Sequence, residues 1–201
     1  MVKNVEETLA KKGIRLPMKC NLPTKHGYRP EMDCTGELKA DGLQWYQELI
    51  GSLRWTVEIS RVDILLETTI LSKHLALPRE GNLEQVLNII GYMKRRKKLL
   101  LLFDSGYPTT NEKLFKKYDW FDFYQDAEEA ITPNTPSARG HGVVDTCFVD
   151  ANRGVNLKDW KSQTGVLIFI NKSPIHWYSK LQTIWKPPSF PSTFLYHMKV
   201  T

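Results

Sequence analysis

The chain has 201 residues, of which 41% are hydrophobic and 11% aromatic, enough to bury the core of one ordinary domain or two small ones. It has no run of 18 uninterrupted apolar residues, which argues against a transmembrane helix, and carboxylates occupy the N-terminal segment where a secretory signal would be apolar. We therefore expect an intracellular protein, in the cytoplasm or the nucleus, with no membrane partner.

A formal net charge of +6 favours a polyanionic partner such as nucleic acid, although an excess of lysine is also an ordinary way to stay soluble. The three cysteines, Cys20, Cys34 and Cys147, are odd in number and widely spaced. They fit neither a disulfide framework nor a zinc-binding spacing, so free thiols are expected. The five histidines are never within four residues of one another, which argues against a local His-based metal motif.

The first half of the chain is predicted to be mainly helical. Residues 2–12 place Val5 and Leu9 on one side and charge on the other, as in a short amphipathic helix. Pro and Gly are scattered between residues 13 and 41, so an extended crossing is expected there. A second helix is predicted over 43–57, because apolar residues recur on one broad face. These residues are Trp45, Tyr46, Leu49, Ile50, Leu53 and Val57.

Two more helices and a strand are predicted next. Ser60 and Asp63 have the spacing of a capping box at the start of a helix over 62–76, which Pro78 ends. Asn82 with Gln85 is a weaker start signal for a helix over 83–98. The buried stripe of that helix is expected to contain Leu83, Val86, Leu87 and Ile90. The apolar run "LLLLF", residues 99–103, predicts a short buried strand.

The second half is predicted to be a linker followed by strands. Residues 105–142 combine aromatic and acidic residues with a Pro-, Ser- and Gly-rich stretch, which indicates a linker with one helical turn around 122–130. Three strand-like runs follow, and Asn171 to Pro174 form the turn between the last two. These runs cover residues 143–150, 165–171 and 174–179. The tail from residue 183 contains three prolines within five residues and is not predicted to be helical.

The densest charge cluster is "KRRKK", which consists of Lys94, Arg95, Arg96, Lys97 and Lys98. Five cations at a helix C-terminus complement the helix dipole. The same cluster could contact phosphates or act as a nuclear-import patch, and the two explanations are compatible. The sequence has no phosphate-binding loop, dinucleotide fingerprint, nucleophile elbow or H-E-x-x-H motif.

Asp150 ends the first strand-like run and precedes a polar loop and a Gly-led second strand, which is how metal-dependent nucleases place their first carboxylate. Two magnesium ions need several carboxylate oxygens as ligands. Asp145 lies five residues earlier, an odd offset that predicts the opposite face of the strand, about 16 Å along the chain. Asp159 is expected to be a solvated loop residue. Asp150 alone is therefore not expected to form a competent metal site.

Two groups of motifs resemble copia-type retrotransposon Pol polyproteins. "YQELIGSLRW", "RVDI" and "GYMK" in residues 46–94 resemble the helical segment that follows the palm of the reverse transcriptase. "FVDAN", "KSQTG" and "PIHWYSKLQ" in residues 148–182 resemble the start of the RNase H domain of the same polyproteins. The resemblance covers about residues 1 to 182, and the two groups occur in the family's order with a linker between them.

The resemblance implies that Asp150 is a remnant of the first RNase H carboxylate. The polymerase carboxylates of the family lie in a Y-x-D-D-type hairpin upstream of the matching segment, and this sequence has no Asp-Asp pair. The next RNase H carboxylate would lie on a helix just after Lys180 and Gln182, where this chain has "WKPPSFPSTF" and no acidic residue after Asp159. A frame slip near Gln182 would explain this change, and reading the other frames of the gene should then recover an acidic helix.

We therefore expect an α+β fold with a helical reverse-transcriptase thumb- or connection-like unit and an incomplete RNase H-like, three-stranded antiparallel sheet. The expected divisions are 1–104, the post-palm unit; 105–142, the linker; 143–182, the truncated RNase H-like domain; and 183–201, an unrelated, disordered tail. Such a half-domain would leave one sheet face without covering helices and one edge unpaired, which predicts marginal stability or self-association.

The expected function is that of a catalytically inactive Pol fragment without a cofactor, although the intact family uses Mg²⁺. Weak binding of an RNA:DNA hybrid or another nucleic acid through residues 94–98 is expected. Two alternatives remain open: a domesticated nucleic-acid-binding module, and an RNase H that another polypeptide completes by supplying the missing carboxylates.

Overall fold

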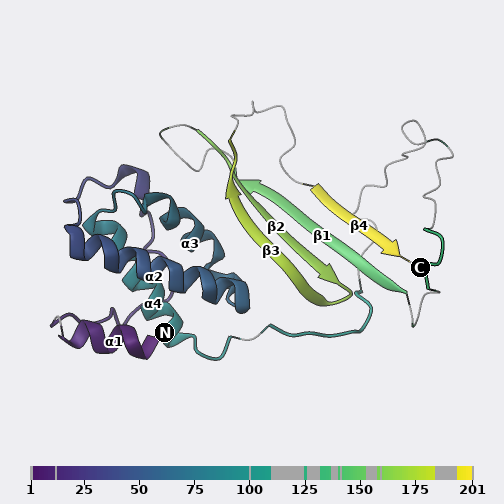
Figure 1. The fold of residues 1–201 in the computed structure, drawn as a ribbon, viewed down its shortest axis with the longest axis horizontal. Helices are drawn as coiled ribbons and strands as arrows, with labels where there is room; N and C mark the ends of the chain where they lie inside the picture. The colour runs from purple at the N-terminus through teal and green to yellow at the C-terminus, as the bar shows by residue number, and fades with distance from the viewer. Residues whose placement is uncertain are drawn as a thin grey trace.

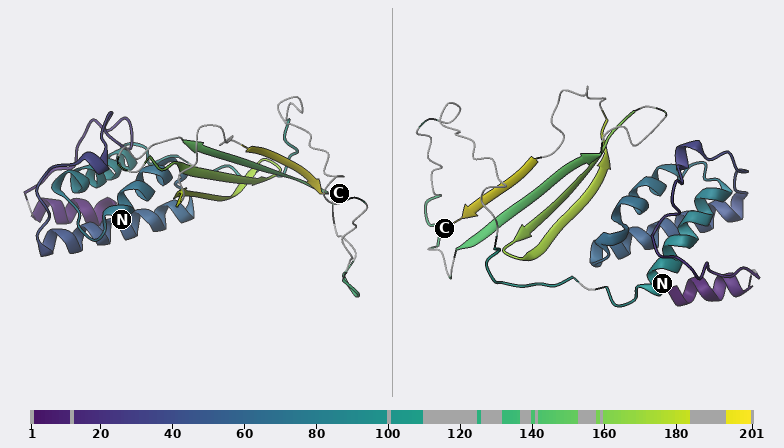
Figure 2. Two further views of the ribbon diagram at one scale, coloured as in Figure 1. Left: turned by 90° about the horizontal axis from the view of Figure 1, so that it is seen from above. Right: turned by 180° about the vertical axis from the view of Figure 1, so that it is seen from behind.

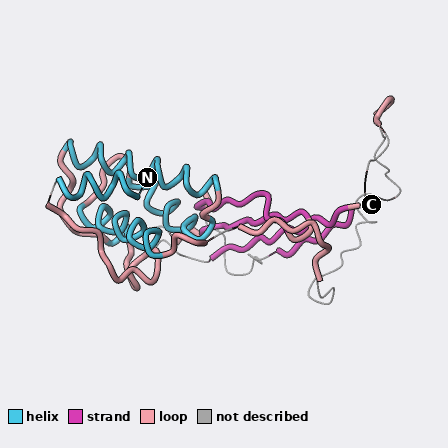
Figure 3. The backbone as a smooth tube through the Cα atoms, turned by 90° about the horizontal axis from the view of Figure 1, so that it is seen from below, coloured by secondary structure: helices cyan, strands magenta, loops and turns pink. Residues whose placement is uncertain are grey.

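The structure is a computed structural model that describes residues 2–11, 13–99, 101–109, 125, 132–136, 140, 142–152, 158, 160–183 and 194–200. Within these residues the helices gather at one end of an elongated molecule and an antiparallel sheet forms the other end (Figure 1, Figure 2, Figure 3). The helices are α1 (Val2–Lys11), α2 (Ala40–Ile59), α3 (Leu65–Leu71) and α4 (Glu80–Arg95). The strands are β1 (Val143–Asn152), β2 (Gln163–Ile170), β3 (Ser173–Leu181) and β4 (Phe194–Val200). The predicted α+β class is thus confirmed.

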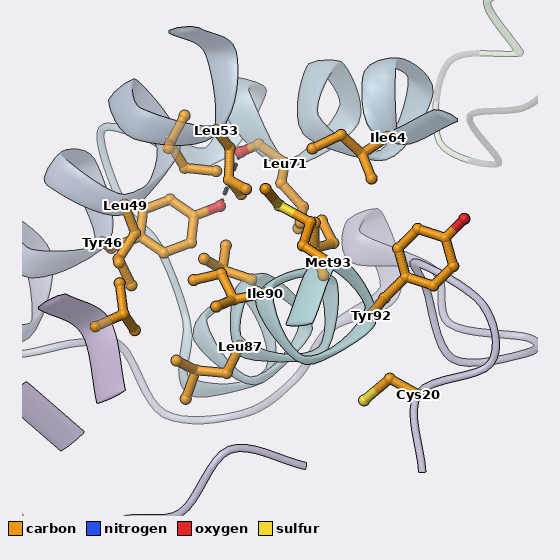
Figure 4. Close-up of a cluster of buried hydrophobic side chains, with 14 of the residues drawn as sticks. Cys20, Tyr46, Leu49, Leu53, Ile64, Leu71, Leu87, Ile90, Tyr92 and Met93 are labelled. Carbon is orange, nitrogen blue, oxygen red and sulfur yellow. Dashed lines mark hydrogen bonds between the residues drawn. The ribbon is translucent and has the colours of Figure 1, made fainter. Parts of the chain in front are cut away.

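The core of the helical unit is built from the predicted apolar stripes. Val5 and Leu9 of α1 are buried, as are five of the six apolar residues predicted for α2, while Trp45 is half-buried against them. Figure 4 shows side chains of α2, α3 and α4 meeting in this core, where the hydroxyl of the buried Tyr46 donates a hydrogen bond of 2.8 Å to the carbonyl oxygen of Leu71. None of the described helices has the length and apolar character needed to cross a membrane.

Helix α4 is buried on a polar face as well as an apolar one. Asn82, Gln85 and Asn88 recur at steps of three and have exposed fractions of 1%, 1% and 6%. The side chain of Gln85 accepts a hydrogen bond from the backbone N–H of Lys25, at 3.1 Å. The side chain of Asn88 donates to the carbonyl oxygens of Leu22 and Pro23, at 3.1 and 2.7 Å. These bonds hold the crossing segment, residues 13–39, against α4 although it contains only one 3₁₀ turn, Pro30–Met32.

A second group of bonds holds the crossing segment at the start of α4. The hydroxyl of Tyr28 donates to Asp33 at 2.9 Å and accepts from the Asn82 amide at 2.8 Å. The hydroxyl of Thr35 donates to Asp33 at 2.7 Å and accepts from the backbone N–H of Gly81 at 2.9 Å. Burial raises the pKa of Asp33, but its bonds with Thr35 and Tyr28 and the charge of Arg79 outweigh this effect and place the pKa below its ordinary value.

The predicted helix starts need correction. Helix α4 begins at Glu80, and the Asn82 side chain accepts a hydrogen bond of 2.9 Å from the backbone N–H of Arg79, so Asn82 does cap this helix whereas Gln85 does not. The predicted helix 62–76 is shorter: α3 lies between two 3₁₀ turns, Val62–Ile64 and Ser72–His74. No side-chain cap precedes it, so the predicted capping box is wrong, because Asp63 pairs with the side chain of Arg61 instead.

The strand predicted over 99–103 is also wrong for the described residues. Leu102 and Phe103 are in irregular structure and are 76% and 67% exposed. The next two residues are attached to the β2–β3 turn by its side chains rather than paired with a strand: Ser173 donates to the carbonyl oxygen of Asp104, and Asn171 to that of Ser105, each at 3.0 Å. An apolar run becomes a strand only where a neighbouring strand offers its backbone groups. The helical turn predicted around 122–130 lies outside the described residues except for Gln125.

The described sheet has the order β3-β2-β1-β4 and is antiparallel throughout. The three predicted strands are confirmed, and a turn at residues 171–172 joins β2 to β3. The fourth strand is a correction, because β4 lies in the tail that was expected to be disordered. Its backbone pairs with the outer edge of β1, with Val143 opposite Val200. The edge of β1 supplies the hydrogen-bond partners that the isolated tail sequence could not reveal.

Two glycines of the helical unit make a matched pair for testing the packing of α4. A Cβ at Gly91 would lie 2.7 Å from the carbonyl oxygen of Pro17 and 2.8 Å from the Sγ of Cys20, whereas a Cβ at Gly51 of α2 would meet nothing within 4 Å. Gly91→Ala is expected to lower the free energy of unfolding by about 1–3 kcal/mol because the crossing segment must move. Gly51→Ala should raise it by about 0.5–1 kcal/mol through helix propensity. Urea unfolding measures both, and equal effects would contradict this account.

Candidate functional site

The Asp150 carboxylate lies on the exposed part of one sheet face. Asp150 is opposite Gly165 of β2, which is opposite Ser179 of β3, so these three residues form one cross-strand row on the same face. Asp150 is exposed, and its Oδ1 accepts a hydrogen bond of 2.8 Å from the backbone N–H of Ala151. Gly165, the residue opposite it on β2, has no side chain.

The two other candidate carboxylates do not join Asp150 among the described residues. Asp145 is on the same strand at an odd offset and therefore on the opposite face, as predicted. Its Oδ1 is buried and has no hydrogen-bond partner among the described atoms. Asp159 lies outside the described residues. Within the described part of the chain no three His, Cys, Asp or Glu side chains are close enough together to hold a metal ion.

The face that carries Asp150 also meets the helical unit. The indole N–H of Trp177 on β3 donates a hydrogen bond of 3.0 Å to the carbonyl oxygen of Val57 on α2. The ammonium of Lys73 donates to the side chain of Gln163 on β2, at 3.0 Å, and the amide of Gln163 donates to the hydroxyl of Ser179, at 2.8 Å. A pocket of about 290 Å³ lies between α2, α3 and β3, and Ser179 is part of its wall. The helices therefore contact this face in the rows on both sides of the Asp150 row, and they approach that row itself at Ser179.

The basic cluster, residues 94–98, lies at the C-terminal end of α4. Lys94 and Arg95 are in the last turn of the helix, where they complement its dipole as predicted, and Lys94 is paired with Glu6 of α1. All five cations are exposed. Arg95, Arg96, Lys97 and Lys98 form the wall of a shallow hollow together with Leu99, and within the described part of the chain none of these four pairs with a carboxylate. The cluster thus places four cations at the surface.

The motif "RVDI" forms an ion pair between a buried arginine and an exposed aspartate, which the sequence interpretation missed. Arg61 is 8% exposed, and its guanidinium donates two hydrogen bonds to the two oxygens of Asp63, at 2.7 and 2.8 Å. Its guanidinium carbon also lies 5.8 Å from the ring centre of Tyr92 on α4. Burial raises the pKa of Asp63, but the hydrogen bonds and charge of Arg61 outweigh it, so the pKa is below its ordinary value. The sequence signal that could have predicted this ion pair is the two-residue spacing of Arg61 and Asp63, which have opposite charges.

The remaining candidate residues have ordinary surroundings. Cys20, Cys34 and Cys147 are free thiols, as predicted, and burial raises the pKa of Cys20, whose thiol donates to the Asn88 side chain at 3.2 Å. His74 is half-buried, and burial lowers its pKa. His26 and His176 are exposed, and neither belongs to a metal-binding group of described residues. These residues do not point to a reaction.

Comparison with protein-family models, with curated proteins and with solved structures finds no match to this chain. The geometry of the chain itself is therefore the basis for assigning a function.

The Arg61–Asp63 ion pair gives a testable prediction. Asp63→Asn removes the charge that balances the buried guanidinium of Arg61, so it is expected to lower the free energy of unfolding by about 1–3 kcal/mol. In a double-mutant cycle, the double variant Arg61→Met with Asp63→Leu should lose less free energy of unfolding than the sum of the losses in Arg61→Met and in Asp63→Leu. Because the pKa of Asp63 is lowered by folding, its contribution is present above the ordinary carboxyl pKa and is lost as the pH falls through the lowered pKa. Urea unfolding measures the cycle, and strictly additive effects would refute the coupling.

Proposed function

We propose that this chain is a catalytically inactive fragment of a copia-type retrotransposon Pol polyprotein that retains nucleic-acid binding. The motifs in residues 46–94 and 148–182 support this lineage, since they occur in the family's order. The strongest single support from the geometry is the position of Asp150. It lies at an exposed position on β1 of an antiparallel sheet, opposite Gly165, the last residue of the "KSQTG" motif.

The arrangement of the helices agrees with this lineage. The motif "YQELIGSLRW" contributes core residues of α2, and "RVDI" contributes the Arg61–Asp63 ion pair between α2 and α3. The motif "GYMK" contains Gly91, where the crossing segment packs closely against α4. Packing and pairing within the helical unit thus account for the residues of these three motifs. They support a shared helical architecture rather than a reaction at this end of the molecule.

Inactivity is proposed because a two-metal nuclease needs several carboxylate ligands on one face. Asp145 is on the opposite face of β1 from Asp150. Asp159 is the last acidic residue of the 201. Without more carboxylates on the Asp150 face, one aspartate cannot hold two divalent ions and offset their charge.

The basic cluster is the part of the chain to which we assign binding. A polyanion that contacts Arg95 to Lys98 would release counterions, which makes affinity depend on salt and not on sequence. RNA:DNA hybrids and other nucleic acids all offer such phosphate contacts. Salt-dependent binding is therefore expected both of a Pol fragment and of a domesticated binding module.

A second candidate function is an RNase H that another polypeptide completes. The observation that favours it is that Asp150 and Gly165 leave their part of the sheet face accessible. A partner that supplied carboxylates on a helix could approach this face.

The sheet also supports a proposal of self-association. Phe148, Ile170 and Tyr178 are 39%, 36% and 42% exposed, and β3 and β4 are the edges of the described sheet. Exposed apolar side chains and unpaired strand edges favour contact between copies.

The proposed lineage can be tested with the gene sequence on both sides of the reading frame. A palm domain upstream and the rest of the nuclease downstream are expected.

Binding of an RNA:DNA hybrid across a salt series tests the basic cluster. The affinity of the unmodified chain should fall with salt, and Lys97→Gln with Lys98→Gln should reduce the slope of log affinity against log salt by about 0.7–0.9 for each lost phosphate contact. Lys39→Gln with Lys180→Gln is the matched control, because it removes the same charge from exposed positions elsewhere. Equal losses in both double variants would contradict a localised site.

A cleavage assay distinguishes the two candidate functions. With Mg²⁺ and an RNA:DNA hybrid, the chain and its Asp150→Asn variant are expected to give the same background rate. Cleavage by the purified chain that Asp150→Asn abolishes would refute inactivity. Cleavage that appears only after a cell extract is added, and only when Asp150 is present, would instead support completion by a partner.

A further inference from the structure

A pocket of about 170 Å³ lies between the crossing segment and α3. The crossing segment contributes Thr24, Lys25, Tyr28 and Pro30 to its wall, and α3 contributes Leu66, Glu67, Ile70 and Leu71. A space of this size exceeds that of one water molecule and is comparable to cavities that accept a small organic group. Most of the wall is apolar. The pocket is separate from the Asp150 face and from the basic cluster.

Two polar groups in this wall have unused acceptor capacity: the Glu67 carboxylate, which has a hydrogen bond only with its own backbone N–H and no described cation, and the Thr24 hydroxyl. Glu67 is half-buried, and burial raises the pKa of its carboxyl group, an effect to which the nearby negative charge of Asp63 adds. No described cation pairs with Glu67. The hydroxyl oxygen of Thr24 is buried and has no hydrogen-bond partner among the described atoms. A buried acceptor without a donor is costly, so a ligand that supplies donors here would be stabilised.

The one lysine in the wall does not serve Glu67. The ammonium of Lys25 is paired with Glu84 of α4, and its backbone N–H is bonded to the Gln85 side chain. Lys25 is therefore bonded to α4. Tyr28 is also engaged, because its hydroxyl donates to Asp33 and accepts from Asn82.

We propose that this pocket binds an alkylammonium group, with the ammonium at Glu67 and the Thr24 hydroxyl and the alkyl stem against Leu66 and Ile70. An ammonium has three donors, which suits a carboxylate and a hydroxyl that both have free acceptor capacity. An anion would be repelled by Glu67, and a neutral apolar group would leave the carboxylate unpaired. The ligand class comprises the end of a free polyamine and the lysine side chain of a partner protein.

Titration of the full chain with n-butylammonium, followed by amide chemical shifts in NMR spectra, tests the proposal. Saturable shifts are expected at Thr24, Leu66 and Ile70. Glu67→Gln keeps the size of the side chain and should weaken binding at least tenfold, and Thr24→Val should weaken it several-fold. Glu58→Gln is the matched control on the exposed surface of α2 and should bind as the unmodified chain does. Circular dichroism confirms that each variant is folded.

Three results would overturn the proposal: no saturable shift at these amides, equal affinity in the Glu67→Gln variant, or equal affinity for n-butanol, which has the same stem without the charge. Spermidine and a short peptide with one lysine separate the two sources of the ligand. Of spermidine and the peptide, the ligand that binds more tightly to the unmodified chain, and that binds at least tenfold more weakly to Glu67→Gln, identifies the source. If neither ligand distinguishes Glu67→Gln from the unmodified chain, the proposal fails.

Discussion

The helical unit depends on α4 being buried on two chemically different faces. Its apolar face packs against α2 and α3, while Asn82, Gln85 and Asn88 bind the crossing segment on the other side. Because buried amide groups are stable only when they are hydrogen-bonded, these three side chains and the backbone of the crossing segment require one another. The close approach at Gly91 belongs to the same contact. This explains how a long segment with little secondary structure is held in one place, and how the pocket beside Glu67 arises.

The sheet is much less enclosed than the helices. Its described contacts with the helical unit include the bond between Trp177 and Val57 and the bond between Lys73 and Gln163, on either side of the Gly165–Ser179 pair. Antiparallel sheets usually bury one face against other elements. The exposure of Phe148 and Tyr178 therefore supports the proposal that this part of the chain descends from a larger domain.

The candidate sites were partly predictable. The alternation of side chains along a strand was sufficient to place Asp145 and Asp150 on opposite faces, since β1 is regular across this stretch. The position of the basic cluster at the end of a helix followed from apolar periodicity. The pairing of Lys94 with Glu6 could not be predicted, because the partner lies 88 residues away. The Glu67 pocket was missed for the same reason, because its wall joins two segments that are distant in sequence.

The sequence by itself determined the apolar stripes of α1, α2 and α4 and the three strands β1 to β3, because each depends on a local period that a buried face requires. Tertiary structure decided which polar residues are buried, why Asp63 pairs with Arg61 instead of capping a helix, and why residues 99–103 do not form a strand while β4 does. The physical reason is that hydrogen-bond and charge partners come from distant segments. A local pattern specifies the face that must be covered but not the group that covers it.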